Sequence, residues 1–327
     1  MTANDIRNIC LLGHGGSGKT TLAEQMLFMT KGTDRLGRTA DGNTVCDYDA
    51  EEIKRQISIS LAFAPVKYKD VRINVMDAPG NFDFSGEAIS AIRAAECAVL
   101  VGAAKDGLSV GMERSWKLLG KKPRMIFVNR TDEDNSDYNA TFEALRARFG
   151  NKIAPLVVPI WDEGKKVTGI IDVLNKRAYE MQNGKRVEIE LPEGKEDVVT
   201  QFNDALKESV AETSEEFMDR YFEGDTFSVT EVSAALATNV QEAAIVPVCM
   251  GSPINLRGVS NLLDDICGYF PSPDKRSCNG ISQKTNEIFE ANYDFAKTKS
   301  AYVWKTIVDP FLGKYSLIKV ASGVIKS

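Results

Sequence analysis

A glycine-rich segment near the N-terminus carries residues whose types and spacing are suited to binding phosphate. Gly13 and Gly18 are separated by four residues, and Lys19 and Thr20 follow directly, which satisfies the spacing of a phosphate-binding loop. Glycines let successive backbone N–H groups turn toward phosphate oxygens, and a following helix adds its positive dipole end. Lys19 is predicted to reach the β- and γ-phosphates of a nucleotide, and Thr20 to offer its hydroxyl to Mg²⁺. The residues predicted to bind nucleotide here are Gly13, His14, Gly15, Gly16, Ser17, Gly18, Lys19, Thr20 and Thr21.

The segments on either side of this loop supply the context that the motif requires. The apolar run Ile9–Leu12 is suited to a buried strand, and a helical pattern extends from Leu22 to about Met29. The expected order is strand, phosphate loop and helix. A glycine-rich structural turn is the alternative, but the flanking elements favour phosphate binding. The polar residues 31–47 that follow the helix have the composition of a mobile surface loop.

A second group of candidate residues follows the β-rich run Val71–Asp77. Asp77 stands at the carboxyl end of this predicted strand, and Gly80 follows three residues later. Ligands of open α/β sheets bind at that end of the strands. We expect Asp77 to hold Mg²⁺ through water and Gly80 to present its N–H to a γ-phosphate. An Asp-Ala-Pro-Gly surface turn is the simpler interpretation of these four residues, and the upstream phosphate loop argues against it.

Asn129 and Asp132 follow the predicted strand Pro123–Val128 and have the chemistry to read a base. An Asp carboxylate can accept hydrogen bonds from both N1–H and the 2-amino group of guanine, whereas adenine offers neither donor at those positions. The Asn-x-x-Asp pattern is common, and an Asp that caps a helix is the alternative. Because the pattern follows a strand at the right distance from the phosphate loop, we expect guanine recognition.

The overall composition is that of an ordinary globular protein. The chain has 327 residues, 43% of them hydrophobic, and a net charge of −6, so its charge balance indicates neither nucleic-acid nor membrane binding. The N-terminus is polar and no stretch reaches about 18 apolar residues, so we expect a cytoplasmic protein without a signal peptide or membrane span. The cysteines form no CxxC pair and are expected to be reduced, partly buried thiols: Cys10, Cys46, Cys97, Cys249, Cys267 and Cys278.

The order of these motifs resembles the GTP-binding domain of the translational GTPases, most closely elongation factor G and its paralogues. Residues 55–59 (Arg-Gln-Ile-Ser-Ile) occupy the place of the family's Arg-Gly-Ile-Thr-Ile loop, and Ser58 precedes Asp77 by 19 residues, as in the family. Residues 77–87 match the family's Asp-Thr-Pro-Gly-His-x-Asp-Phe stretch. Residues 247–273 resemble the last guanine-contacting loop with its helix, and residues 302–323 resemble the opening strands of the second domain.

The resemblance implies an α/β P-loop GTPase domain with a mostly parallel sheet, an α+β insert and the start of a β-barrel domain. The implied boundaries are 1–157 and 246–282 for the two parts of the GTP-binding domain, 158–245 for the insert, and 283–327 for a linker and truncated barrel. Within the insert, the apolar positions Phe202, Leu206 and Val210 recur at helical spacing. The aromatic residues Phe217, Tyr221 and Phe222 are expected to continue this face as core.

Several site roles are also implied by the resemblance, some at positions that depart from the family pattern. Ser58 would join Thr20 and Asp77 as a metal ligand, and Arg130 replaces a Lys that packs over the base. Asn81 stands where the family has the His that orients the attacking water, beside Lys19 and Gly80 as the other catalytic positions. Ser252 and Pro253 fall in the last guanine-contacting loop. Proline has no N–H to donate to the guanine O6, so that contact would fall to Ile254 or water.

The implied function is a GTP-binding and GTP-hydrolysing translation factor of the elongation factor G type, using GTP or GDP and Mg²⁺ and turning over slowly without the ribosome. The implied partners are the ribosome and, through the insert, the ribosomal stalk protein, with no membrane and no direct sequence-specific nucleic-acid binding. A GTP-dependent regulatory binding module with negligible hydrolysis is the alternative. An ATP-using transport or partition ATPase is a third, against which Asp132 argues. The chain is expected to be the GTP-binding part of a longer multidomain factor.

Overall fold

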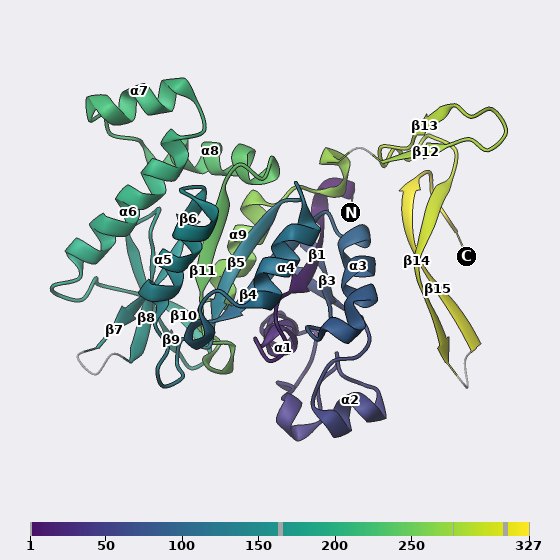
Figure 1. Ribbon diagram of the computed structural model, residues 1–327, viewed down its shortest axis with the longest axis horizontal. Coiled ribbons are helices and arrows are strands. Elements are labelled where there is room, and N and C mark those ends of the chain that lie inside the picture. Colours follow the sequence, from purple (N-terminus) through teal and green to yellow (C-terminus); the bar gives the residue numbers. More distant parts are fainter. Residues whose placement is uncertain (1, 163–165, 277, 310–312, 327) are drawn as a thin grey trace.

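The computed structural model describes residues 2–162, 166–276, 278–309 and 313–326. Its centre is a seven-stranded sheet with the order β2-β3-β1-β4-β5-β11-β6 (Figure 1). Strand β2 is antiparallel to β3, and the other neighbouring strands run parallel. The strands of this sheet are β1 (Ile6–Leu12), β2 (Ala62–Tyr68), β3 (Val71–Asp77), β4 (Cys97–Ala103), β5 (Arg124–Asn129), β6 (Ile153–Pro155) and β11 (Val246–Met250). The α/β fold expected from the sequence is confirmed.

Helices cover this sheet and make its central strands fully buried. Strands β4 and β5 are buried at every residue, which explains why they appear in the sequence as continuous apolar runs rather than alternating ones. Helix α1 packs against α9, and α3 and α4 contact β1 and β4 respectively. The helices of this layer structure are α1 (Lys19–Met29), α2 (Ala50–Arg55), α3 (Ser85–Ala94), α4 (Val110–Leu119), α5 (Tyr138–Phe149) and α9 (Val259–Tyr269).

The parallel register brings the ends of three motif-bearing strands to one edge of the sheet. Leu11 at the end of β1 lies opposite Asp77 at the end of β3. Ala103 at the end of β4 lies opposite Asn129 at the end of β5. Because β4 pairs with β1, all of these positions share the carboxyl edge, where ligands of α/β sheets bind.

A smaller antiparallel sheet and three helices lie between β6 and β11 in the sequence and form a separate region at the left of Figure 1. Its strand order is β10-β9-β8-β7. Strands β8 and β9 pair as antiparallel neighbours, with Ile170 opposite Tyr179. The elements are β7 (Val157–Trp161), β8 (Val167–Asp172), β9 (Arg177–Gln182), β10 (Lys185–Ile189), α6 (Glu196–Ala211), α7 (Glu215–Glu223) and α8 (Val229–Gln241).

The predicted aromatic core of this region is only partly correct. Phe202, Leu206 and Val210 are buried on α6. Helix α6 ends at Ala211 and α7 begins only after the capping residue Ser214, so the helical period is interrupted. As a result Phe222 is 79% exposed and does not belong to the core, whereas Phe217 and Tyr221 pack partly against it.

Two antiparallel hairpins follow the seven-stranded sheet in the sequence. They pair β12 (Asn279–Ile281) with β13 (Ile288–Glu290), and β14 (Ser300–Asp309) with β15 (Gly313–Ser322). The long β14–β15 hairpin stands beside α3 (Figure 1). The strands expected within residues 302–323 are thus present as β14 and β15.

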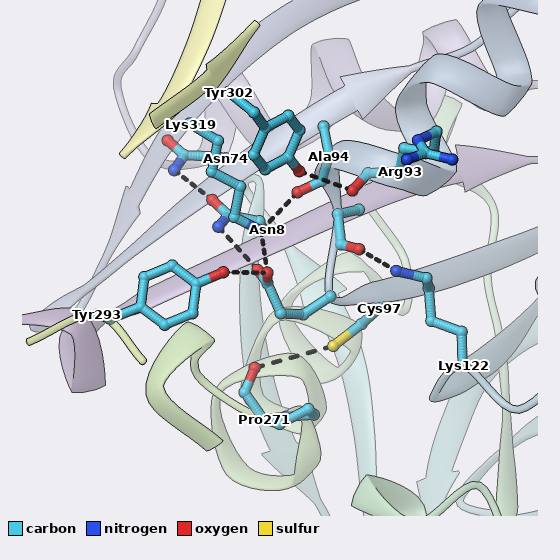
Figure 2. Close-up of polar contacts among 12 residues, drawn as sticks. Asn8, Asn74, Arg93, Ala94, Cys97, Lys122, Pro271, Tyr293, Tyr302 and Lys319 are labelled. Carbon is cyan, nitrogen blue, oxygen red and sulfur yellow. Dashed lines mark hydrogen bonds and ion pairs between the residues drawn. The ribbon is translucent and has the colours of Figure 1, made fainter. Parts of the chain in front are cut away.

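A polar network joins this hairpin to the central sheet, centred on the buried carboxylate of Glu96. Asn8 Nδ2 donates to Glu96 at 2.8 Å, and Asn74 Nδ2 donates to Asn8 Oδ1 at 2.7 Å. Lys319 of the hairpin forms an ion pair with Glu96, and the hydroxyl of Tyr293, which lies between β13 and β14, donates to Glu96 at 3.4 Å (Figure 2). With only 4% of its side chain exposed, the carboxylate of Glu96 is stabilised by the ammonium and amide donors around it.

A second contact joins the hairpin to the Ser58 loop and to helix α3. Lys305 on β14 donates to the Leu61 carbonyl oxygen at 3.0 Å and pairs with Glu87 of α3 at 2.5 Å. The same Glu87 oxygen accepts the backbone N–H of Leu61 at 2.7 Å. One carboxylate therefore joins three segments that are far apart in the sequence.

The cysteines are free thiols, and four of them are buried, as the sequence predicts: Cys10, Cys46, Cys97 and Cys249. One of these thiols forms an unusual contact, because Cys249 Sγ donates to Asp265 Oδ2 on α9 at 3.1 Å. Across the residues placed by the structure, no helix combines the length and apolarity needed to cross a membrane.

Asp265 gives a testable pH dependence. Burial raises the pKa of Asp265 to about 7, and the hydrogen bond from Cys249 offsets part of this increase. The folded protein therefore holds this proton more tightly than the unfolded chain, so the contribution of Asp265 to stability is full below about pH 4 and is lost as pH rises through about 7. We expect the stability of Asp265→Asn to fall less with rising pH than that of the native protein. Urea unfolding of the two proteins at pH 6 and pH 8 measures this difference. An equal pH dependence in the variant and the native protein would show that Asp265 is not the group that titrates.

Candidate nucleotide-binding site

The phosphate loop connects β1 to α1, and packing requires glycine at two of its positions. Gly13 has φ of +146°, and a Cβ there would lie 2.1 Å from the Val101 carbonyl oxygen. Gly18, with φ of +91°, caps α1, and a Cβ there would lie 2.3 Å from Asn129 Nδ2. The close approach of β4 and β5 to the loop thus excludes side chains at both positions.

Lys19 lies under the loop with its ammonium near the site predicted for phosphate. Its Nζ donates to the carbonyl oxygens of His14 at 2.8 Å and Gly13 at 3.3 Å. Burial lowers the pKa of Lys19 to about 8, and the nearby carboxylates of Asp77 and Asp47 oppose this shift. Bound phosphates would restore the charged form by the same electrostatic effect.

The loop after β3 closes directly against the phosphate loop. A Cβ on Gly80 would lie 2.5 Å from Lys19 Nζ and 2.6 Å from Gly15 N. Gly80 is therefore close to the groups predicted to bind the terminal phosphates. Any larger residue at this position would displace one of the two loops.

The three predicted metal ligands are brought together by the fold. Thr20 Oγ1 donates to Asp77 Oδ2 at 2.6 Å and lies 3.0 Å from Ser58 Oγ. Asp77 is 1% exposed and its Oδ1 has no hydrogen-bond partner among the described residues. Burial raises the pKa of Asp77 to about 7. Two hydroxyls and a carboxylate with an unused oxygen fit Mg²⁺, which prefers oxygen ligands.

A fourth oxygen-bearing residue at this position was not identified from the sequence. Asp47 is 4% exposed, lines the same cavity as Thr20 and Ser58, and neither of its carboxylate oxygens has a hydrogen-bond partner in the described part of the chain. Burial raises the pKa of Asp47, and the nearby Ser58 hydroxyl and, more weakly, the Lys19 ammonium oppose this shift. Asp47 is therefore placed to face a cation together with Asp77.

The position of Asp47 corrects the expectation that residues 31–47 form a mobile surface loop, because the end of this segment is buried. Glu24 of α1 accepts the backbone N–H groups of Val45 at 2.7 Å and Cys46 at 3.1 Å. Glu24 is buried because this loop packs back onto α1. The sequence shows a glutamate in the helix but does not show that it is buried.

Asn81, the position predicted to orient water, is exposed beside the phosphate loop. Its Oδ1 accepts the Asp83 N–H at 3.2 Å and so caps a short 3-10 turn, Phe82–Phe84. The ring of Phe82 meets His14 edge to face at 5.9 Å between ring centres. Asn81 is thus near the phosphate loop, with its amide N–H₂ available to a ligand.

The residues predicted to read guanine lie on the next part of the same edge. Asn129 is 1% exposed, and its Nδ2 donates to the Ser17 carbonyl oxygen at 2.7 Å, which ties β5 to the phosphate loop. Arg130 pairs with Glu133 at 2.9 Å. Asp132 is exposed and lines a cavity of about 1090 Å³.

The loop after β11 approaches this cavity from the other side. Ser252 is fully buried, and Pro253 is buried at the start of a 3-10 turn, Pro253–Asn255. The next residue, Ile254, is 62% exposed and borders both this cavity and that of the phosphate loop. Since Pro253 has no N–H, Ile254 is the adjacent residue with a backbone donor.

A cavity of about 760 Å³ adjoins the phosphate loop and is bordered by most of that loop and by Asp47, Ser58, Gly80 and Asn81, whereas Gly13 and Asp77 are not among its lining residues. It shares Leu36 and Ile254 with the cavity at Asp132, so the predicted phosphate and base sites are neighbours. Thr21 also lines it, whereas Ser17 and Asn129 are buried behind it. The fold therefore brings the sequence-predicted residues together around two adjoining cavities.

The fold and these sites define a GTP-binding domain of the translation-factor type. Residues 4–272 match the elongation factor Tu GTP binding domain, and the chain belongs to this family. A solved structure, that of ttk003000868 from Thermus thermophilus, is similar to the chain with 33% sequence identity and a TM-score of 0.85. The match covers 98% of this chain and 46% of the Thermus chain, so the present chain spans about half the length of that protein.

Proposed function

We propose that this chain is the GTP-binding part of a ribosome-associated translation factor of the elongation factor G type, which hydrolyses GTP to GDP and phosphate. The observation that carries the proposal is the pair of adjoining cavities, with Lys19 and Gly80 at one and Asp132 at the other. This separation matches a ligand with phosphates at one end and a guanine base at the other. Membership of the elongation factor Tu family supports the same nucleotide.

The proposed roles follow from the positions of the side chains. Thr20, Ser58 and Asp77, with Asp47, would hold Mg²⁺, which when bound neutralises charge on the β- and γ-phosphates. Lys19 would bind the same phosphates, and Gly80 would donate its N–H to the γ-phosphate.

Recognition of guanine is assigned to the cavity lined by Asp132. Asp132 would accept from N1–H and the 2-amino group, and Asn129 would hold the phosphate loop beside it through Ser17. The stem of Arg130 would pack over the base, with its guanidinium held by Glu133. Ser252 and Pro253 would shape the wall at guanine O6, where Ile254 or water replaces the missing donor.

Nucleotide-dependent change would involve the Ser58 loop and the loop from Asp77 to Gly80. Both reach the phosphate end, since Ser58 contacts Thr20 and Gly80 contacts the phosphate loop. Release of the γ-phosphate would free both loops and change the affinity for the ribosome. The ribosome and a cytoplasmic location are inferred from the resemblance to elongation factor G.

The region from 158 to 245 is proposed as an inserted subdomain that contacts the ribosomal stalk protein. Its acidic residues are exposed and so accessible to a partner, although they also fit a solvated surface: Glu188, Glu190, Glu193, Glu196 and Asp197. The remaining boundaries are proposed as 1–157 and 246–282 for the GTP-binding domain and 283–327 for the linker and barrel start.

A binding titration with GTP, GDP and ATP tests the nucleotide, and GTP turnover with intact ribosomes tests the enzyme. We expect GTP and GDP to bind and ATP to bind weakly, because Asp132 would face no donors on adenine. Tighter binding of ATP than GTP would contradict guanine recognition. Binding without turnover above background would favour the alternative, a GTP-dependent regulatory module with negligible hydrolysis.

Replacing Asn81 with His separates these two functions. An imidazole can accept a proton and become cationic near the attacking water, whereas the Asn81 amide cannot. We expect Asn81→His to raise ribosome-stimulated GTP turnover by about 10²- to 10³-fold, the usual value of one well-placed group. Asn81→Ala is the matched control and should not gain activity. Equal turnover in the His variant and the native protein would show that position 81 does not orient water.

A further inference from the structure

A basic side chain that belongs to none of the recognised motifs lies at the cavity beside the phosphate loop. Arg38 stands between α1 and α2, where residues 36–40 contribute to the lining of the 760 Å³ cavity. The same cavity is lined by Gly15, Lys19 and Gly80, which mark its phosphate end. Arg38 is therefore at the space assigned to the nucleotide.

The other long cationic side chains at this cavity are already engaged. Lys19 donates to two carbonyl oxygens of the phosphate loop, and Arg130 pairs with Glu133. The guanidinium of Arg38 is exposed and, within the ranges that the structure describes, makes no ion pair or hydrogen bond. Its donors are available to an anion.

The backbone that carries Arg38 is held in place by its own loop and by α1. The Arg38 N–H donates to Asn43 Oδ1 at 2.7 Å, and the Arg38 carbonyl accepts the Asp41 N–H at 3.1 Å. The preceding Gly37 is buried so tightly that a Cβ would lie 2.2 Å from Glu24 Oε2 and 2.9 Å from Thr44 Cα. A fixed backbone reduces the conformational entropy lost when the side chain binds a ligand.

We infer that Arg38 binds the phosphates of the nucleotide as a second protein cation beside Lys19. A guanidinium presents planar donors that match phosphate oxygens in a bidentate geometry. The inference rests on the proposed function, because the ligand is the same guanine nucleotide. It adds a phosphate contact from the loop before α2, a position where no sequence motif indicates one.

The test compares GTP with guanosine, which has the base and ribose but no phosphates. Affinities of the native protein, Arg38→Ala and Arg38→Lys are measured by calorimetry, with guanosine as a millimolar competitor. We expect Arg38→Ala to weaken GTP binding by about 10- to 100-fold, the value of a charge-assisted hydrogen bond, and to leave guanosine binding unchanged. Arg38→Lys should recover part of the loss.

Arg35→Ala is the matched control, because Arg35 lies in the same loop and donates to the Asn43 carbonyl oxygen at 3.1 Å without lining the cavity. It should bind GTP as the native protein does. The inference is overturned if Arg38→Ala binds GTP normally, or if it loses GTP and guanosine affinity by the same factor. If the native protein binds no GTP, the proposed function fails and the inference with it, whereas native GTP binding with a silent Arg38→Ala overturns the inference alone.

Discussion

Replacing Lys19 with Met is expected to weaken GTP and GDP binding by about 100- to 1000-fold, because it removes the ammonium and keeps the length of the stem. Hydrogen bonds to charged groups contribute about 1.5 to 3 kcal/mol each, and Lys19 is proposed to contact two phosphates. Equilibrium titration with a fluorescent guanine nucleotide measures this change. Unaltered affinity would mean that the phosphates bind elsewhere.

The same variant has a second expected result that separates lost binding from lost folding. Burial lowers the pKa of Lys19 to about 8, so the ammonium is disfavoured in the folded protein without nucleotide. We therefore expect Lys19→Met not to lower the free energy of unfolding in the absence of nucleotide. Lys121→Met, at an exposed position, is the control and should alter neither property.

Gly13→Ala is expected to lower the free energy of unfolding by about 3 to 5 kcal/mol. The new Cβ would meet the Val101 carbonyl oxygen at 2.1 Å, and the backbone at φ of +146° is unfavourable for any residue with a side chain. Because strand β4 is buried at every residue, Val101 has little room to move away. Urea unfolding of the purified variant measures the loss.

Gly107→Ala is the matched control for this effect. Gly107 also has a positive φ, of +57°, but a Cβ there would have open space within 4 Å. Backbone strain alone, at φ of +57° and ψ of −136°, should cost about 1 to 3 kcal/mol. A Gly13→Ala variant no less stable than Gly107→Ala would show that contact with β4 does not limit this position.

The elements that carry the site could be predicted from the sequence where the signal is local. The apolar run before Gly13 and the helical pattern after Thr20 are contiguous, and they appear as β1 and α1. Asp77 and Asn129 end strands whose apolar runs are equally visible. The positions of these strands and of this helix depend on residues that are neighbours in the chain, so the pattern and spacing of residues are sufficient to predict them.

The residues that were missed depend on contacts between distant segments. Glu24 is a charged residue within a predicted helix and Asp47 ends a polar segment, and nothing in their spacing distinguishes them from surface groups. They are buried because the loop before α2 folds back onto α1, which only the tertiary structure shows. The prediction for Phe222 was wrong because of a local feature of the chain. The break between α6 and α7 shifts the helical phase and leaves this side chain exposed.

The shared carboxylate of Glu87 has a mechanical consequence for the β14–β15 hairpin. Glu87 holds Leu61, three residues after Ser58, and pairs with Lys305 of the hairpin. A displacement of the hairpin therefore pulls on the segment that carries a proposed metal ligand. By thermodynamic reciprocity, any free-energy effect of bound nucleotide on the position of the hairpin would be matched by an equal effect of the hairpin position on nucleotide affinity. The hairpin and the segment that carries Ser58 are therefore linked through one carboxylate, so we expect a change at either end to alter the other.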